Sequence, residues 1–514
     1  MADSWKFVFF LLLALSGSGS AGARDVDPPP LVATHFFYWY RYPDEHFPTE
    51  RGGEGHRHQF MRKEQVSYES ADWYEGEFQE MARAGIDIAL PVYWGAPGAY
   101  ERPGIRFSRA GLKPMVKALD RLQQRSLPRV KLGLFYDTST LLNDVRGAEP
   151  RGGRADLTAD SGRDLFCRTV IEYFEQIPSR HWARLNHDPL DGAVPVVLYG
   201  SAFAAAWDPG LGDHLRAAFS KKFPNERICL VADVSWGDIG QDLTTAWGAA
   251  LTGPKLFDRV AQIGPGYDDT QVPGRRTPIR EREEGDFYRW SWQQALAYRP
   301  ELVILETWNE MHEGTELCPS KELGDLYSQL TRVFVDRLKQ GLAPGPPITL
   351  RQKELLPRED LSFGREAEGL NAVTIDYASE ERIGLTEGVC EDGPFRIEGG
   401  WLRAGGAAEK MRYLYFRVSD YWRFNVDEEL WLVVTREPGG SVSVQYDSRD
   451  EQATLSGAYT QVAVTSTERQ GSLVVERYRL PGARLANRQN SGSDLRLAFS
   501  GSGPVVRRIE LRAD

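Results

Sequence analysis

The feature that most constrains the fold is an alternation of short apolar runs with helical segments over roughly the first 340 residues. Eight runs have the length and the apolar content of strands that are buried on both faces. These runs are residues 32–40, 86–94, 130–137, 194–199, 228–234, 245–251, 260–264 and 302–308. Eight β/α repeats predict an α/β fold, a (β/α)8 TIM barrel, whose active site lies at the carboxyl ends of its strands.

The segments between these runs carry helical periodicity. Apolar side chains recur at spacings of three and four between Leu112 and Leu122, and again between Leu323 and Phe334. Gly85 and Gly341 stand where a glycine is expected to end a helix. The pattern therefore predicts amphipathic helices around the barrel.

The character of the chain changes across the Gly- and Pro-rich segment 340–347. Beyond it, short runs that alternate apolar and polar residues are separated by Gly, Ser and Asp turns, which is typical of an antiparallel β-sandwich. These runs are 413–418, 430–434, 441–446, 473–478, 495–499 and 505–511. The predicted division is a signal peptide (1–23), a catalytic barrel (24–341), and a linker with a carbohydrate-binding-like β-sandwich (342–514).

The first residues have the order of a secretory signal peptide. Lys6 precedes the apolar run Phe7 to Leu15, and small residues follow up to Ala23, after which cleavage is expected. No later run is long enough to span a bilayer. We expect a secreted or periplasmic protein.

Composition excludes some classes of partner. The 62 basic and 73 acidic residues are interspersed and give a net charge of −11, which does not indicate a nucleic-acid-binding protein. The four cysteines lie far apart, without metal-ligand spacing, so they are either small buried residues or partners in a disulfide. They are Cys167, Cys229, Cys318 and Cys390. We expect no catalytic metal and no cofactor, and the oligomeric state stays open.

Aromatic and acidic side chains gather where the predicted strands end. Pyranose rings stack on aromatic faces while their hydroxyl groups need donors and acceptors, so this mixture predicts a site for an oligo- or polysaccharide. For any single one of these aromatic residues the core is the favoured place, and it is their accumulation at the strand ends that indicates a sugar site. The candidate substrate-binding residues are Tyr38, Tyr40, Tyr93, Trp94, Tyr136, Asp137, Asp233, Trp236, Trp247, Tyr267 and Asp268.

The stretch ETWNEMHEGTE, residues 306–316, brings ionisable groups to the end of the last apolar run. Cleavage of a glycosidic bond needs two carboxyl groups in different environments, and Glu310 and Glu313 can supply them. Crowding beside Trp308 would push their pKa values apart, while Asn309 could hold a substrate hydroxyl and His312 could orient a glutamate. The alternative is a pair of solvated carboxylates at the start of a helix.

The same stretch resembles the N-E-W-H-E-G-T signature of glycoside hydrolase family 99, the endo-α-mannosidases and endo-α-mannanases, and of the related family 71 α-glucanases. More closely still, the layout resembles an exported bacterial family labelled a domain of unknown function. The layout comprises the Phe-Tyr-Trp-Tyr first strand, the segments 247–250 and 265–269, and a trailing sandwich.

The resemblance implies a retaining cleavage of α-linked mannan- or glucan-type glycans. Glu313 would be the general acid, and Glu310 the base that takes the proton of the substrate's 2-hydroxyl so that a 1,2-anhydro sugar forms. Met311 departs from the family pattern, which usually has Trp there, and this puts the substrate in doubt. The rival interpretations are a non-catalytic glycan-binding protein with a degenerate barrel and a purely structural envelope protein.

A cluster of arginines follows the Tyr267 turn. It could bind an anionic sugar or a phosphate, but a solvated loop is the expected interpretation. The arginines are Arg275, Arg276, Arg280 and Arg282.

Overall fold

The computed structural model describes most of the chain. The described residues are 28–48, 55–100, 102–143, 154–273, 275, 277–352, 355, 363–390, 393–405, 412–440, 442–455, 457–499 and 503–513. The predicted signal peptide lies outside them. Within these ranges, no helix has both the length and the apolar character needed to cross a membrane.

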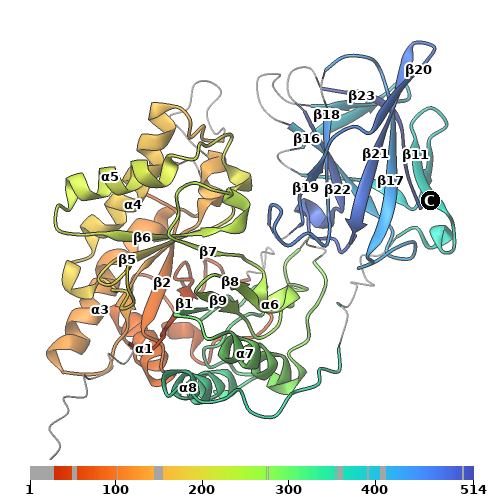
Figure 1. Cartoon of the computed structure of the whole chain (residues 1–514). Coiled ribbons are helices and arrows are strands. Elements are labelled where there is room, and N and C mark those ends of the chain that lie inside the picture. Colours follow the sequence, from red (N-terminus) through yellow and green to blue (C-terminus); the bar gives the residue numbers. More distant parts are fainter. Residues whose placement is uncertain are drawn as a thin grey trace, which may run out of the picture.

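A nearly closed parallel barrel forms the first part of the molecule (Figure 1). Its strands follow the order β7-β6-β5-β4-β2-β1-β10-β9, with β3 beside β2 and an antiparallel β8 beside β9. Between the edges β7 and β9, Thr245 donates a hydrogen bond to the side-chain oxygen of Gln262. The strands are β1 (Leu31–Phe36), β2 (Ile88–Tyr93), β3 (Lys131–Leu132), β4 (Leu134–Tyr136), β5 (Val194–Leu198), β6 (Ile228–Asp233), β7 (Leu243–Thr245), β8 (Lys255–Phe257), β9 (Val260–Ile263) and β10 (Leu302–Leu305).

The predicted barrel is confirmed, but one of its eight predicted strands is wrong. The run 245–251 is a strand only at Thr245, where β7 ends, and its last three residues begin helix α6 (Ala249–Thr252). Gly248 turns the chain there with a φ of 98°, in the left-handed region that favours glycine. A short apolar run of this kind fits a strand or a helix equally well.

Helices surround the barrel on the outside (Figure 1). The helices expected over 112–122 and 323–334 are present as α3 and α8, although α8 begins only at Leu326, and Gly85 and Gly341 follow the ends of α1 and α8 with positive φ angles of 85° and 64°. The helices besides α6 are α1 (Ala71–Arg83), α2 (Arg106–Ala110), α3 (Leu112–Gln124), α4 (Asp160–Gln176), α5 (Leu211–Lys222), α7 (Asp286–Tyr298) and α8 (Leu326–Lys339).

The second part is built from two antiparallel sheets, as predicted. One runs β12-β11-β23-β17-β21-β20 with β15 on β23 and β14 on β15, and the other runs β13-β16-β22-β18-β19. The strands are β11 (Ala372–Asp376), β12 (Glu381–Ile383), β13 (Leu385–Gly388), β14 (Phe395–Glu398), β15 (Trp401–Ala404), β16 (Arg412–Val418), β17 (Glu428–Arg436), β18 (Val442–Tyr446), β19 (Thr460–Val462), β20 (Ser466–Gln470), β21 (Leu473–Ala483), β22 (Leu495–Phe499) and β23 (Val505–Ala513). In β17 every second side chain, Leu430, Leu432 and Val434, is buried between the sheets.

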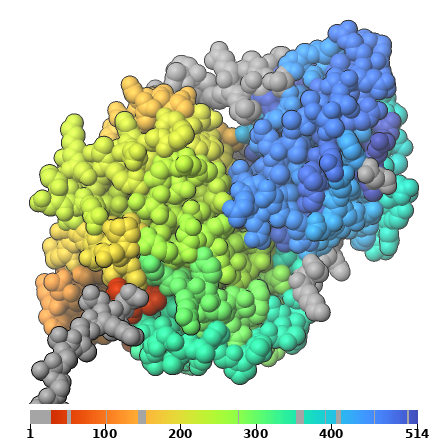
Figure 2. Space-filling view, viewed as in Figure 1, coloured from red at the N-terminus to blue at the C-terminus, as the bar shows by residue number. Residues whose placement is uncertain are grey.

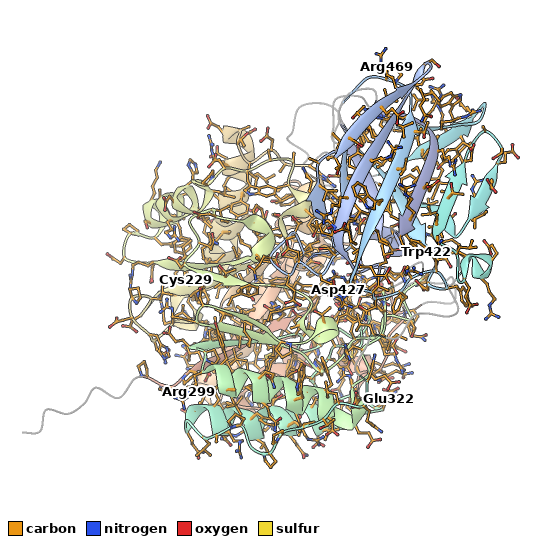
Figure 3. All side chains as sticks on the ribbon, turned by 45° about the vertical axis from the view of Figure 1, so that its right-hand side comes forward. Cys229, Arg299, Glu322, Trp422, Asp427 and Arg469 are labelled. Carbon is orange, nitrogen blue, oxygen red and sulfur yellow. The ribbon has the colours of Figure 1, made fainter. Side chains whose placement is uncertain are left out.

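The four cysteines, all within the described residues, form no disulfide. Cys167, Cys229 and Cys318 are buried, and Cys229 lies on β6 (Figure 3). Of the two alternatives left open by the sequence, the structure has small side chains rather than a crosslink.

The two parts pack against each other (Figure 2). The buried ammonium group of Lys255 in the barrel lies 3.3 Å from the Glu451 carboxylate of the sandwich. The Leu455 side chain lies so close to Gly200 that a Cβ atom there would be 2.4 Å from it. The sandwich is therefore fixed over one end of the barrel.

Candidate active site

The loop that follows β10, residues 306–316 and here called the motif loop, is anchored by its own polar residues rather than held open to solvent. The side-chain amide of Asn309 accepts a hydrogen bond from the Phe37 N–H and donates one to the Phe37 carbonyl, both at 2.8 Å. The indole N–H of Trp308 donates to the Glu77 carboxylate on α1. Both side chains are fully buried, so they hold the loop against β1 and α1.

Glu310 lies in this anchored part of the loop. It is 2% exposed, and its Oε1 accepts hydrogen bonds from the His312 N–H at 3.0 Å and from the Tyr40 hydroxyl at 3.4 Å. The Tyr40 hydroxyl also accepts the Met311 N–H. The Glu310 carboxylate thus has a fixed orientation on the barrel side of the loop.

His312 packs into an aromatic cluster beside Glu310. Its ring stacks on Tyr40, with ring centres 5.7 Å apart, and its Nδ1 lies 3.0 Å from the Gly55 carbonyl oxygen. Burial lowers the pKa of His312 to about 4, so the imidazole is neutral at pH 7. Its backbone N–H, not its ring, is what reaches Glu310.

Glu313 stands further along the loop in an ion-pair cluster. The Arg275 guanidinium donates to the Glu313 carboxylate at 2.5 Å and to the Tyr267 hydroxyl at 3.2 Å, and it lies 3.6 Å from the Asp269 carboxylate. Burial, together with the Glu313 charge, raises the pKa of Asp269. In this arrangement Arg275 connects Glu313, Tyr267 and Asp269.

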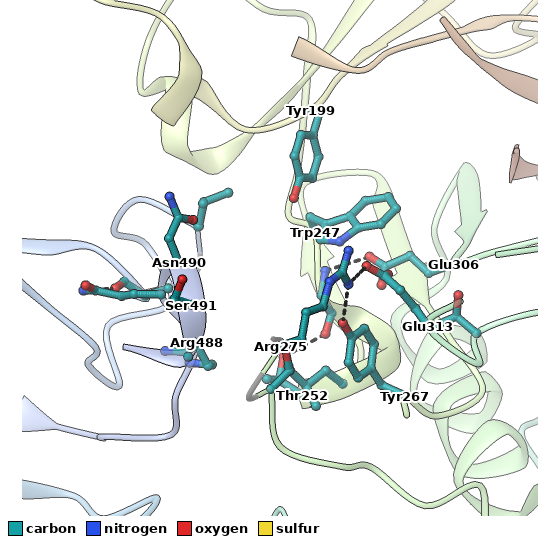
Figure 4. A pocket seen from close by; sticks show the side chains of 18 of the residues that line it. Tyr199, Trp247, Thr252, Tyr267, Arg275, Glu306, Glu313, Arg488, Asn490 and Ser491 are labelled. Atoms are coloured by element: carbon teal, nitrogen blue, oxygen red, sulfur yellow. Dashed lines mark hydrogen bonds and ion pairs between the residues drawn. The ribbon is translucent and has the colours of Figure 1, made fainter. Parts of the chain in front are cut away.

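A pocket of about 540 Å³ opens beside Glu313, between the barrel and the sandwich (Figure 4). From the barrel it is lined by Tyr199, Trp247, Tyr267, Arg275, Glu306 and Glu313. From the sandwich it is lined by Leu455, Ala458, Arg488, Gln489, Asn490 and Ser491. Its size lies within the range of about 300–1,000 Å³ that is usual for small-molecule sites.

Of the predicted site residues, the pocket brings together Glu313, Trp247 and Tyr267. Asp268 lies beside it, where its carboxylate accepts from Arg57 at 2.5 Å. The Asp233 carboxylate supports the pocket from behind, because it accepts the N–H of Trp247 at 2.9 Å, and its burial raises its pKa.

The other predicted residues have partners in the barrel interior. The Tyr38 hydroxyl donates to the Ser108 carbonyl, Tyr136 pairs with Tyr100, and Trp236 donates to the Tyr199 carbonyl. Tyr93 packs on Tyr173. The Trp94 indole donates to Asp137 at 2.6 Å and lies under the guanidinium of Arg102. Together with Tyr40, Trp308, Asn309, Glu310 and His312, these residues are buried and are not part of the described lining of this pocket.

Three groups of pocket residues were missed or misread in the sequence. Glu306 precedes the predicted pair and was not selected, although it shares the same acidic stretch. Arg275, expected in a solvated loop, is bound to Glu313 instead. Arg488 to Ser491 come from the sandwich, and no sequence signal connects that loop with the barrel.

The expectation of a solvated arginine loop is wrong for the other described arginines as well. Arg280 is 7% exposed and donates to the Leu251 carbonyl, and Arg282 pairs at 3.0 Å with the fully buried Glu316. Arg276 lies outside the described residues. These arginines brace the loops at the pocket instead of facing solvent.

Glu306 enters the pocket from the end of β10. Its carboxylate accepts hydrogen bonds from the N–H groups of Gly248 and Ala250, at 2.9 and 3.0 Å, and from the side chain of Gln262. Burial raises the pKa of Glu306 to about 7 despite these donors. Glu306 therefore ties α6 to the motif loop and titrates near neutral pH.

This titration predicts a pH dependence of stability. Because the pKa of Glu306 is higher in the folded protein than its ordinary value of 4.5, its stabilising contribution is complete below pH 4.5 and is lost as the pH rises through about 7. The difference between these two pKa values corresponds to about 3 kcal/mol in the free energy of unfolding. We expect the free energy of unfolding of the wild type, relative to Glu306→Gln, to be lower at pH 8 than at pH 5 in urea titrations. An equal difference at both values would contradict this assignment.

Among the described residues, no group of three or more His, Cys, Asp or Glu side chains is placed to hold a metal ion.

The barrel region matches the model of a known protein family. Residues 35–337 match the family model described as "Domain of unknown function (DUF5010)", which is more than half of the chain. The chain belongs to this family. The DUF5010 region includes β2 to β10, the motif loop and the barrel wall of the pocket.

Curated relatives match shorter parts of the chain. A glycoprotein endo-alpha-1,2-mannosidase-like protein of Danio rerio is 39% identical over 72 residues, which are 13% of this chain and 16% of the relative. The glycoprotein endo-alpha-1,2-mannosidase of Xenopus laevis is 36% identical over 161 residues, which are 31% of this chain and 34% of the relative. The chain thus spans about a third or less of the length of these relatives, and over that part its sequence is glycoside hydrolase-like.

Two solved structures illustrate the range of structural likeness. The GH99 endo-alpha-mannosidase from Bacteroides thetaiotaomicron is 16% identical, with a TM-score of 0.44 over 60% of this chain and 98% of that chain. An Arthrobacter globiformis isomalto-dextranase complexed with panose is 14% identical, with a TM-score of 0.29 over 94% of this chain and 96% of that chain.

Proposed function

We propose that this protein is an exported glycosidase that cleaves α-linked glycans of the mannan or glucan type with retention of configuration. One observation carries the proposal: the motif loop brings the Glu313 carboxylate to a pocket that is also lined by Trp247 and Tyr267. The pocket thus combines aromatic faces on which a sugar can stack with one of the two carboxyl groups that cleavage of a glycosidic bond needs. The sequence similarity to endo-alpha-1,2-mannosidases supports the choice of an α-linked substrate.

In this proposal residues 24–341 form the catalytic domain and residues 342–514 contain the linker and the sandwich. For an α-linked mannose residue, whose 2-hydroxyl lies trans to the aglycone, Glu310 takes the proton of that hydroxyl, and its oxygen then attacks the anomeric carbon. Glu313 gives its proton to the departing glycosidic oxygen, so that a 1,2-anhydro sugar and a free aglycone are formed. Water opens the anhydro sugar in a second step, in which the two glutamates exchange roles.

The ion pair with Arg275 bears on the role of Glu313. The Arg275 guanidinium donates to Glu313 at 2.5 Å and so occupies the carboxyl group that a departing glycosidic oxygen would have to reach. Arg275 also contacts the Tyr267 hydroxyl and lies close to Asp269. We propose that a bound sugar displaces Arg275 from Glu313 toward these two acceptors, so that the Glu313 carboxyl group can contact the departing glycosidic oxygen.

The second candidate function is glycan binding without cleavage. The 2% exposure of Glu310 and the ion pair of Glu313 favour this alternative, because both carboxylates are already engaged within the protein. In this case the pocket would hold a glycan and release no product.

The two functions can be separated with one panel of substrates. α-Mannans, α-glucans and N-glycans are incubated with the full-length protein, and released sugars are followed by chromatography while retention of the glycan is followed by affinity electrophoresis. The glycosidase proposal predicts product from at least one α-linked substrate. Glu281→Gln, an exposed barrel carboxylate outside the pocket, is the matched control and should act like the wild type. A protein that slows the migration of a glycan in electrophoresis but releases no sugar from it would have the binding function and not the glycosidase function.

A further inference from the structure

The sandwich contributes one complete wall of the pocket. Arg488, Gln489, Asn490 and Ser491, here called the sandwich wall, belong to the segment between β21 and β22. In Figure 4 the labelled members of this wall stand across the pocket from Trp247, Tyr267 and Arg275. A ligand that fills the pocket from the barrel side would therefore meet the sandwich.

This wall is held in place relative to the barrel. Besides the Lys255–Glu451 ion pair and the contact of Leu455 with Gly200, the guanidinium of Arg154 lies 4.7 Å from the ring centre of Tyr413. Tyr413 in turn packs against the Arg496 guanidinium, 3.8 Å from its ring centre. Several independent contacts thus fix the distance between the two walls of the pocket.

The side chain of Asn490 is fixed within the wall by two tyrosines. Its Oδ1 accepts the Tyr459 hydroxyl at 3.0 Å, and its Nδ2 donates to the Tyr415 hydroxyl at 3.1 Å. Arg496 donates to Tyr415 at 2.6 Å and lies 4.1 Å from the ring centre of Tyr459. Because Tyr415 and Tyr459 are themselves held by Arg496, the Asn490 amide has a fixed orientation, as a side chain that recognises a ligand requires.

Gln489 has a polar atom that the described protein leaves unsatisfied. Its side chain is 4% exposed, and its Nε2 donates to the carbonyls of Ala458 at 2.6 Å and Gln445 at 3.3 Å. Its Oε1 accepts no hydrogen bond from any residue that the structure describes. A buried acceptor without a partner is unfavourable, and because Gln489 lines the pocket, a small turn of its side chain toward the pocket would let a ligand hydroxyl group supply the missing donor.

We propose that the sandwich wall is a part of the substrate site, in which Gln489 and Asn490 recognise hydroxyl groups of the neutral α-linked hexose that occupies the pocket. This inference rests on the proposed function for the class of sugar, but not on its cleavage. The sandwich then contributes directly to the choice of sugar in the pocket. It does not act as a separate domain that only attaches the protein to a polysaccharide.

The test is a binding experiment with full-length Glu313→Gln, so that turnover does not interfere. Calorimetry gives the Kd for α-mannotetraose and for maltotetraose before and after Gln489→Met, which removes the amide and keeps the side-chain length. We expect Kd for the preferred tetraose to rise about tenfold, and the preference between the two sugars to narrow. Gln470→Met is the matched control, because its neighbour Arg469 lies at the tip of the sandwich away from the barrel (Figure 3).

A second variant, Asn490→Asp, keeps the shape of the side chain and decides the matter if Gln489→Met does not fold. Unchanged Kd values in the folded variants would overturn the inference, and product released by the wild type would still uphold the proposed function. An equal loss of affinity for both sugars with a lower melting temperature would also overturn it, because it indicates a structural role. If binding depends on Gln489 but the wild type cleaves no substrate, the role of the sandwich wall in binding is upheld. The proposed glycosidase activity is then contradicted.

Discussion

Replacing Glu313 by glutamine is expected to lower kcat for α-linked glycans by about a hundredfold or more, because general acid catalysis of this kind contributes 10²–10⁴-fold. Glutamine keeps the size of the side chain and can still meet Arg275, but it cannot deliver a proton to the departing oxygen. Initial rates of reducing-sugar release measure the effect. Glu310→Gln should cause a loss of similar size.

The choice of leaving group separates the roles of the two glutamates. A 2,4-dinitrophenyl glycoside of the preferred sugar departs without protonation, so Glu313→Gln should retain much more of its activity on this substrate than on a glycan. Glu310→Gln should be impaired on both, because the attack of the 2-hydroxyl still needs a base. Equal losses on both substrates for Glu313→Gln would remove its assignment as the acid.

Replacing Glu77 by alanine is expected to lower the free energy of unfolding by about 3 kcal/mol. Glu77 accepts the indole N–H of Trp73 at 2.9 Å and that of the buried Trp308, and a buried donor left without an acceptor costs about 1–3 kcal/mol. Urea unfolding at pH 8 measures the change. Because Trp308 anchors the motif loop, activity should fall as well.

Two variants serve as controls for this prediction. Glu77→Gln keeps one acceptor oxygen and should cost less than Glu77→Ala. Glu80→Ala on the same helix removes a carboxylate that is 38% exposed and paired with Arg83, an interaction worth at most about 1 kcal/mol. Equal effects of Glu77→Ala and Glu80→Ala would show that the indole N–H groups do not depend on Glu77.

The barrel and the sandwich could be predicted because their patterns are local. Strand β10 is apolar at all four positions and β17 buries every second residue, so their periods can be read directly from the chain. The segment 245–251 could not be assigned in this way, since its turn depends on a left-handed Gly248 and on the contact between Trp247 and Asp233.

The candidate site could be predicted only in part. The acidic stretch after the last strand locates Glu313, but side chains near a strand end can face either the pocket or the interior, and spacing alone does not separate Trp247 from Trp236 or Trp308. The ion pair of Arg275 and the contribution of Gln489 join residues from distant parts of the chain. Such contacts depend on how loops and domains pack, and one sequence carries no pattern for them.

The most direct test of the central claim is to follow the digestion of α-mannan and α-glucan by proton NMR from the first minutes. The wild type is expected to release a product whose newly formed reducing end is first the α-anomer, before mutarotation, because configuration is retained. A product that first appears as the β-anomer would contradict the retaining mechanism. No new reducing end from any α-linked substrate, with the protein folded, would contradict the assignment as a glycosidase.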